Sequence, residues 1–357
     1  MATTFAVPDG RVAMAAALWA GTSATNSISN AVNTVSFQPD FVWLKDRTQA
    51  QYHTLYDSVR GSGSARSLIL PLTDAEGGQS NLYGYLSSFN SNGFTLTPGS
   101  TSSAWVNASG DNYVGWQWKA GGTAVSNTAG TITSSVSANT TAGFSVVTYT
   151  GNGSATASYG HGLGTTPQFI ISKSRNNANA DAGYWDVYHV SLASQYALLL
   201  QGTNAAFLAT SLWASAPTST VVNIGNGSGV NSGSSATYVA YCWAPVAGYS
   251  AFGSYTGNGS ADGPFIYTGF RPRFILYKGY SAAGYDWVMY DTSRNPTNAA
   301  ALQLYSNTSQ ADYTGGPIDI LSNGFKIRSV LNADNASGTS YIYAAFAENP
   351  LKYANAR

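Results

Sequence analysis

Charged side chains are scarce in this chain of 357 residues. Lysine and arginine together number 16, aspartate and glutamate also number 16, and the four types make up 9% of the sequence. Ordinary soluble domains contain about 25%. The formal net charge is zero. Such a chain lacks the basic surface that attracts nucleic acid or an anionic membrane, so we expect neither as a partner.

Cysteine and long apolar runs are lacking as well. The single cysteine, Cys242, excludes a framework of intrachain disulfides. No apolar run reaches the length of about 18 residues that a membrane-spanning helix requires, so we expect no membrane insertion. The segment Met1–Asp9 contains no basic residue, which argues against a signal peptide.

Groups that bind metals or activate nucleophiles are few and scattered. His53, His161 and His189 do not show the spacing of zinc ligands, and His161 lies between glycines in an expected turn. Residues 332–338 offer oxygen ligands for calcium but lack the distal glutamate of an EF-hand loop, so a plain Asn/Asp turn is the favoured interpretation. We therefore expect no metal and no cofactor.

The carboxylates do not suggest an enzyme either. Glycoside hydrolysis requires two carboxylates about 5–10 Å apart. Asp57 and Asp291 are candidates, but each follows a tyrosine at the same place in a repeat, and the remaining copy has His189 there. We interpret these side chains as strand caps that bind loop amides, and we predict that the protein has no catalytic residues.

The chain does contain one short motif that occurs in three similar copies: PDFVWLK, PQFIISK and PRFILYK. Each copy is followed by a tyrosine with a polar neighbour and then by an aromatic closing segment. Internal repetition of this kind is the strongest sequence evidence for architecture. The shared positions are Pro39, Phe41 and Lys45; Pro167, Phe169 and Lys173; Pro272, Phe274 and Lys278; and, in the closing segments, Trp118, Trp243 and Phe346.

The length of the repeat indicates domain-sized units. The second and third copies begin about 105 residues apart, whereas solenoid and propeller units run about 20–50 residues. We predict three tandem domains, or three lobes of one pseudo-symmetric body. The expected divisions are an N-terminal anchor segment at 1–14, β repeats at 15–120, 143–246 and 247–357, and a linker or added edge hairpin at 121–142.

Within each unit the hydrophobic period is two, which is typical of strands. In the first closing segment Val114, Trp116 and Trp118 share one face. The equivalent inward positions should be Trp116, Tyr241 and Ala344, followed by Trp118, Trp243 and Phe346. Only residues 1–18, 191–200 and 296–304 look weakly helical. The sequence thus predicts an all-β fold of sandwich or jelly-roll-like units.

The repeated lysines and the abundant aromatic residues each allow two interpretations. Lys45, Lys173 and Lys278 could contact a partner at three equivalent places. The favoured alternative is that each ends a buried strand, with its ammonium in water or paired. Tyrosines number 24 and tryptophans 9, and most should fill cores, but those in loops could stack on sugar rings. The candidates for receptor binding are Tyr184, Trp185, Trp213, Tyr280 and Tyr285.

Several blocks of this sequence resemble a family of virion proteins of tailed bacteriophages. The resemblance extends over roughly residues 18–350 and departs from the usual pattern at residues 61–66. It implies a fibre-like, tail-associated or lectin-like component of the virion, in a family without defined catalytic residues. The blocks that carry it are residues 37–47, 55–61, 113–122, 143–151 and 160–167.

The sequence leaves two functional classes, and a third class is less favoured. The protein is either an adhesin that attaches the virion to a host-surface glycan or protein, or a head decoration, collar or fibre-base protein that binds only other virion proteins. A glycan depolymerase is the least favoured alternative. We expect residues 1–14 to dock to the virion and the chain to form a homo-oligomer. The resemblance favours a trimer, although three repeats could instead create threefold pseudo-symmetry within one chain.

Overall fold

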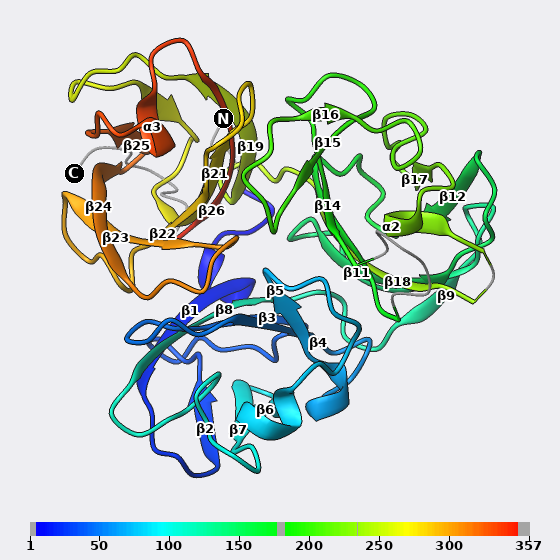
Figure 1. The fold of residues 1–357 in the computed structure, drawn as a ribbon, viewed down its shortest axis with the longest axis horizontal. Coiled ribbons are helices and arrows are strands. Elements are labelled where there is room, and N and C mark those ends of the chain that lie inside the picture. The colour runs from blue at the N-terminus through cyan, green and yellow to red at the C-terminus, as the bar shows by residue number, and fades with distance from the viewer. Residues whose placement is uncertain (1–4, 177–182, 234, 349–357) are drawn as a thin grey trace.

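The computed structural model describes residues 5–176, 183–233 and 235–348 and shows three β lobes around a common centre (Figure 1). The first lobe is blue to cyan, the second is green, and the third runs from yellow to red. Each lobe corresponds to one predicted repeat, and the all-β prediction is confirmed. The helices in the described residues are single turns: η1 (Gly10–Val12), η2 (Ser64–Arg66), α1 (Ser80–Tyr83), α2 (Ser228–Asn231) and α3 (Asn332–Asn335).

The first lobe is a sandwich of a large inner sheet and a small outer sheet. The inner sheet has the order β1-β8-β3-β4-β5, and the outer sheet has the order β2-β7-β6. The inner strands are β1 (Met14–Ala20), β3 (Phe41–Asp46), β4 (His53–Asp57), β5 (Leu68–Leu70) and β8 (Asn112–Trp118). The outer strands are β2 (Asn26–Ser29), β6 (Tyr85–Asn90) and β7 (Gly93–Thr97).

The second lobe repeats this strand order and extends it. Its inner sheet runs β16-β15-β14-β13-β18-β11-β10-β9, and β12 pairs with β17 in the outer layer. The inner strands are β9 (Val125–Asn127), β10 (Ser134–Asn139), β11 (Phe144–Thr150), β13 (Phe169–Ser174), β14 (Trp185–His189), β15 (Tyr196–Leu199), β16 (Phe207–Leu208) and β18 (Thr237–Trp243). The outer strands are β12 (Ala157–Gly160) and β17 (Val221–Ile224).

The third lobe joins its two layers into one sheet of order β19-β26-β21-β22-β23-β24-β25-β20. Its first five strands correspond to β1-β8-β3-β4-β5 of the first lobe, which supports the repeat interpretation. The strands are β19 (Ser250–Thr256), β20 (Phe265–Tyr267), β21 (Pro272–Gly279), β22 (Trp287–Asp291), β23 (Ala300–Tyr305), β24 (Tyr313–Leu321), β25 (Gly324–Ile327) and β26 (Ser340–Ala347).

Strand register places the repeated residues at matching positions. In each lobe the phenylalanine two residues after the repeated proline lies opposite the last aromatic residue of the closing strand. The pairs are Phe41 with Trp118, Phe169 with Trp243, and Phe274 with Phe346. All six side chains are buried, so the prediction that the closing-strand aromatics form a core is confirmed.

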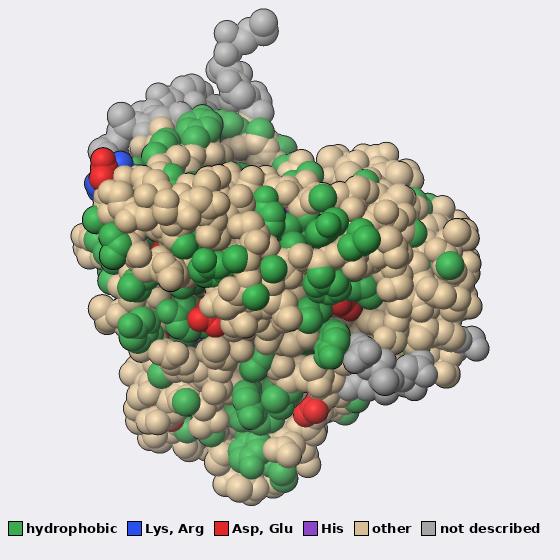
Figure 2. Space-filling view, turned by 45° about the horizontal axis from the view of Figure 1, so that its top comes forward, with side chains coloured by type: hydrophobic (Ala, Val, Ile, Leu, Met, Phe, Trp, Pro, Cys, Tyr) green, Lys and Arg blue, Asp and Glu red, His purple; other side chains and the backbone are tan. Residues whose placement is uncertain are grey.

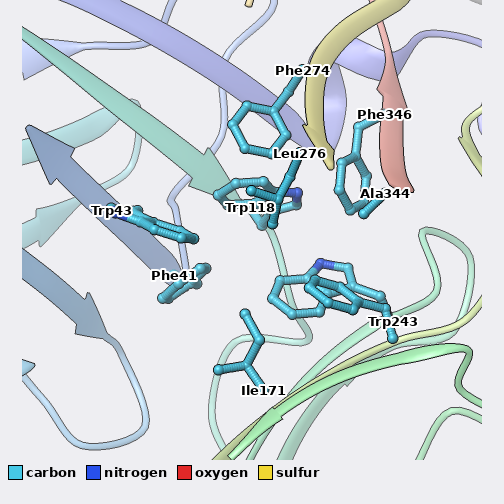
Figure 3. A pocket seen from close by; sticks show the side chains of 10 residues that line it. Phe41, Trp43, Trp118, Ile171, Trp243, Phe274, Leu276, Ala344 and Phe346 are labelled. Carbon is cyan, nitrogen blue, oxygen red and sulfur yellow. The ribbon is translucent and has the colours of Figure 1, made fainter. Parts of the chain in front are cut away.

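These aromatic residues meet where the three lobes join (Figure 3). The rings of Trp118 and Trp243, from the first and second lobes, are 6.0 Å apart, and Phe346 of the third lobe lies 5.5 Å from Trp118. One continuous hydrophobic cluster runs through all three lobes. The strand after each repeated proline is apolar on both faces because one face packs at this centre and the other on the outer sheet.

Hydrogen bonds close the three junctions between lobes in the same way. The first residue of β4, β14 or β22 bonds to a backbone carbonyl of a neighbouring lobe. That carbonyl lies at or just after the end of β23, β5 or β15. The pairs are His53 Nε2 with Tyr305 O at 3.0 Å, Trp185 Nε1 with Leu72 O at 3.1 Å, and Trp287 Nε1 with Leu199 O at 2.9 Å. The lobes therefore form a closed ring within one chain.

The repeated lysines are buried, and their ammonium groups are bound to backbone carbonyls. Lys45 Nζ donates to Asp46 O at 2.6 Å and across the junction to Ser309 O at 3.2 Å. Lys173 Nζ donates to Asp74 O of the first lobe at 3.0 Å, and Lys278 Nζ donates to Tyr285 O. The prediction of a structural role is thus confirmed. Of the two expected surroundings of the ammonium groups, water or a partner, the structure shows the partner, because all three lysines are fully buried.

Three segments that looked weakly helical form strands instead. Residues 14–20 are β1, 196–199 are β15 and 300–305 are β23. Alanine and leucine in these segments have a weak helical propensity, and pairing in the sheet overrides it. The segment 121–142 is the added hairpin β9–β10 at the edge of the second lobe, so the hairpin alternative is confirmed over the linker.

The described part of the predicted anchor packs against the protein's own body. Val7 is 1% exposed, and Gly10 is so close to the backbone of Ala347 that a Cβ atom there would lie 2.5 Å from its carbonyl oxygen. Met14 already belongs to β1, where it pairs with Trp118. The boundary of 1–14 is therefore misplaced, and residues 1–4 lie outside the described part of the chain.

Candidate binding clefts

The centre of the ring is packed and offers no binding site. The space between the aromatic side chains there is about 10 Å³, which is no more than a single water molecule needs. A candidate site must therefore lie away from this centre. Figure 2 shows one face with small groups of hydrophobic side chains and few charged ones, so that face presents mostly apolar and uncharged polar groups.

An open cleft of about 560 Å³ lies on the first lobe, with Ser309 of the third lobe at its border. We call it the first cleft. Three aromatic rings form its apolar part. Trp105 lies between Tyr83, whose ring centre is 4.9 Å away, and Tyr52, at 5.9 Å. The amide side chains of Gln51 and Gln79 line the same space.

Backbone hydrogen bonds hold the rings of the first cleft in place. Tyr83 ends the short helix α1, and the loop before β8 folds back onto that helix. Trp105 N donates to Tyr83 O at 3.1 Å, and Ser102 N donates to Leu82 O at 3.0 Å. Trp105 is only 3% exposed, so it forms the floor between the half-buried Tyr52 and Tyr83.

A buried asparagine anchors the same loop in every lobe. Its side-chain NH2 group donates to a backbone carbonyl in the segment that follows β1, β11 or β19, and the bond holds the two loops together. The bonds are Asn107 Nδ2 to Ala24 O at 2.7 Å, Asn231 Nδ2 to Ser154 O at 2.9 Å, and Asn335 Nδ2 to Ser260 O at 2.7 Å.

A second cleft of about 260 Å³ lies at the equivalent place on the second lobe. Tyr184 directly precedes β14 just as Tyr52 directly precedes β4. The floor differs, because Gly229 stands two residues before Asn231 where Trp105 stands two residues before Asn107. Without an indole at this position, the buried Asp186 becomes part of the cleft lining.

The environment of Asp186 is unfavourable for a negative charge. The residue is 1% exposed, and its Oδ2 atom has no hydrogen-bond partner. Burial raises the pKa of the Asp186 carboxyl to about 7, and the nearby Lys173 opposes the rise. Burial also lowers the pKa of Lys173 to about 7. Both groups are therefore easily converted to their neutral forms.

Of the five aromatic residues predicted to contact a receptor, Tyr184 alone lines one of these clefts. Trp185 and Trp213 are buried, with 0% and 1% exposure, so the prediction is wrong for both. Trp185 begins the fully buried strand β14, and its indole donates to Leu72 O across the junction between lobes. Tyr280 packs against the core, and the ring of Tyr285 lies over Gly279 and beside Tyr341.

The repeated aspartates have structural partners. Asp57 Oδ1 accepts from Arg60 N and Asp291 Oδ1 accepts from Arg294 N, both at 2.8 Å, and His189 Nδ1 accepts from Ser191 N at 3.1 Å. The interpretation of these groups as strand caps is therefore confirmed.

Each of these caps also reaches into the neighbouring lobe. Asp57 accepts from the hydroxyl of Tyr241 at 2.9 Å and Asp291 from the indole of Trp116 at 3.1 Å. The position equivalent to Trp116 and Tyr241 in the third lobe is Ala344, which has no donor. His189 instead bonds to the carbonyl of Tyr343 at 3.0 Å.

The remaining candidates for chemistry are also part of the framework. His161 is buried and its two ring nitrogens bond to Leu163 N and Thr218 O, each at 3.2 Å. Residues 332–335 form α3, and Asn335 is one of the anchoring asparagines. Among the described residues, no three His, Cys, Asp or Glu side chains are grouped to hold a metal ion. Every helix in the described residues is too short to cross a membrane.

Comparison with known proteins identifies a family. A family model described as "Domain of unknown function (DUF7483)" matches residues 13–350. The chain belongs to this family. The match begins just before β1 and ends just after β26, so the family domain is the complete ring of three lobes. No curated protein and no solved structure matches the chain.

Most residues that line the clefts were not predicted from the sequence, among them Tyr52, Tyr83, Trp105 and Asp186. A signal existed for Tyr52, because it stands four residues before Tyr56, as Tyr184 stands four residues before Tyr188. Trp105 and Asp186 have no counterpart of their own type in the other repeats, so comparing the repeats could not reveal them.

Proposed function

We propose that the protein is a non-enzymatic virion protein of tailed bacteriophages that attaches to a glycan on the host surface through the first cleft. The observation that carries the proposal is the combination of Tyr52, Tyr83 and Trp105 with the amides of Gln51 and Gln79 in one open cleft. The virion location rests on the sequence resemblance alone.

The chemistry of the first cleft suits an uncharged sugar. Aromatic faces bind the C–H faces of pyranose rings, and Tyr and Trp offer this contact area at a low cost in conformational entropy. Amide and hydroxyl groups can exchange hydrogen bonds with sugar hydroxyls. The described residues that line the cleft include no charged side chain, and its volume of about 560 Å³ is within the range of ligand pockets.

The test is binding of the purified protein to host cells and to immobilised glycans. Tyr83→Ala should reduce binding at least tenfold, and Gln79→Ala should reduce it to a lesser degree. Tyr267→Ala is the matched control, because Tyr267 is 63% exposed on the third lobe and outside the cleft. Equal binding by Tyr83→Ala and Tyr267→Ala would contradict the proposal.

A purely virion-binding role is the second candidate, and a specific feature favours it. The edge strand β20 exposes Phe265 by 45% and Tyr267 by 63%, and an exposed apolar edge strand is suited to pairing with another chain. If the protein binds virions but neither cells nor glycans, and Tyr267→Ala abolishes that binding, this role replaces the adhesive one.

The proposed homotrimer needs its own measurement. The ring already contains three equivalent lobes, so a trimer would have to use surfaces other than the three junctions. Sedimentation of the purified chain gives the answer: a mass three times 37.3 kDa supports the trimer, and a monomeric mass contradicts it.

A further inference from the structure

The second cleft differs in chemistry from the first although it occupies the equivalent place. In the first lobe the floor residue is Trp105, and in the second it is Gly229. A Cβ atom on Gly229 would lie 1.8 Å from Asp186 Oδ2. The carboxylate therefore occupies the space that a side chain at position 229 would otherwise fill, and any residue larger than glycine would displace it.

Asp186 is an acid where the other two lobes have none. Strand register makes it equivalent to Thr54 of β4 and Val288 of β22, both of which lie two residues before the repeated tyrosine. A buried carboxylate without full hydrogen bonding opposes folding. Asp186 Oδ2 has no hydrogen-bond partner, and the residue lies in the lining of the cleft although it is 1% exposed. A donor bound at the bottom of the cleft would supply the missing partner.

Exposed apolar side chains form part of the wall of the second cleft, beside Ser211 and Ser228. Phe207 and Leu208 form the short strand β16 and are 37% and 60% exposed, and Tyr184 is 37% exposed. The described residues that line this cleft include no lysine or arginine. An anionic floor between aromatic and aliphatic walls is the arrangement that binds a cation carried on an apolar body, through charge and cation–π attraction.

We propose that the second cleft binds a free amino group carried on a sugar ring, with the ammonium at Asp186 and the ring against Phe207 and Tyr184. The cleft would then recognise an unacetylated amino sugar within the glycan that the first cleft holds by its neutral units. This inference rests on the proposed glycan-binding function and adds a second, chemically different subsite to it.

Other charged and titratable groups around Asp186 define how binding should depend on pH. Lys173 faces the carboxyl from β13 and favours its ionised form, and the buried hydroxyls of Tyr149 and Tyr238 face it as well. Because burial raises the pKa of Asp186 to about 7, the ammonium should bind best when the carboxyl is ionised. Affinity should fall at least tenfold between pH 7.5 and pH 5.

The experiment compares two probes, a glucosamine oligosaccharide with free amines and its fully N-acetylated counterpart, by titration calorimetry with the full chain. The wild type should prefer the free amine at least tenfold at pH 7.5. Asp186→Asn, which keeps the shape of the side chain, should abolish the preference and its pH dependence. Phe207→Ala, an exposed truncation that leaves the core intact, should weaken binding of the free amine at least fivefold.

The controls separate this inference from the proposed function. Tyr83→Ala in the first cleft should weaken binding of the N-acetylated probe and leave the preference for the amine intact. If the wild type shows no preference, or Asp186→Asn and Phe207→Ala both retain it, the second cleft is not an ammonium site, whatever the first cleft does. Unfolding curves of each variant at pH 7.5 show whether a loss reflects binding or folding.

Discussion

Single side chains at the centre of the ring carry a large share of its stability. Trp243 is 2% exposed and packs on Phe144 at 4.9 Å, on Phe169 at 5.2 Å and on Trp118 at 6.0 Å. Its indole Nε1 has no hydrogen-bond partner, so the residue is held by packing alone. Removal of its side chain leaves a cavity between three lobes that cannot close without moving all of them.

We therefore predict that Trp243→Ala lowers the free energy of unfolding by about 3–5 kcal/mol. Trp243→Phe should cost less, because it keeps an aromatic ring and removes a buried N–H group that has no partner. Urea unfolding followed by circular dichroism measures both. A Trp243→Ala protein as stable as the wild type would show that the aromatic centre contributes little.

Asp186 should make stability depend on pH in a direction opposite to that of most aspartates. Burial raises its pKa from 3.8 to about 7. Between these values the folded protein holds a proton that the unfolded chain has released, so the contribution of Asp186 to stability falls as the pH rises. Asp186→Asn should match the wild type near pH 4 and exceed it at pH 8, by up to about 4 kcal/mol for a shift of about three pKa units.

Urea unfolding of Asp186→Asn and the wild type at pH 4, 6 and 8 measures this difference. Asp262→Asn is the control, because Asp262 lies on the surface, where Lys326 lowers its pKa, and its removal should give no gain at high pH. A difference between Asp186→Asn and the wild type that does not change with pH would mean that the carboxyl ionises at its ordinary value.

At the scale of elements, the loops that follow β4, β14 and β22 lie at the junctions between lobes. In the first lobe the Asp57 carboxylate forms an ion pair with Arg60 at 2.5 Å, both side chains are fully buried, and Arg60 also bonds to Arg66 O. The third lobe has the same pair in Asp291 and Arg294, at 2.6 Å. In the second lobe His189 and Leu192 replace the pair, and no buried charge then needs compensation.

Breaking one partner of this pair should cost more than removing both. Asp57→Asn removes the closer carboxylate from the buried Arg60 guanidinium and leaves it only Glu76, at 3.7 Å, and we predict a loss of about 3–5 kcal/mol in the free energy of unfolding. The double variant Asp57→His with Arg60→Leu copies the second lobe and should recover part of this loss. A double variant less stable than Asp57→Asn would show that the ion pair itself is favourable.

The elements also show what the sequence could predict and what it could not. The strands after Pro39, Pro167 and Pro272 were predictable because burial on two faces leaves a continuous apolar run. The strands β1 and β23 were not, because their alanines and leucines fit a helix equally well and only their neighbours in the sheet decide. The sequence does not reveal the role of the buried Asn107 and Asn335, because their hydrogen-bond partners lie about 80 positions away in sequence.

At the scale of the molecule, repetition predicted the lobes but not the clefts. A core position recurs in every repeat because each lobe must pack against the same centre. The clefts depend on loop residues that differ between lobes: Trp105 fills the position that Gly229 leaves empty, and Asp186 stands where the other lobes have Thr54 and Val288. Binding sites that arise from differences between repeats are hidden from an analysis that looks for what repeats share.

The closed ring leads to a last prediction, that no lobe folds by itself. The inner face of the first lobe presents Phe41, Trp43, Trp116 and Trp118, all at most 2% exposed in the full chain. In isolation these side chains would form an apolar patch larger than soluble monomers tolerate. The Asp291 carboxylate that accepts from Trp116 and the Tyr305 carbonyl that binds His53 would also be missing.

Residues 5–120 alone should therefore aggregate or form a compact state without fixed tertiary packing, while residues 5–348 unfold in one cooperative calorimetric transition. Three separate transitions in the full chain, or a well-dispersed NMR spectrum of residues 5–120, would show instead that the lobes are independent domains.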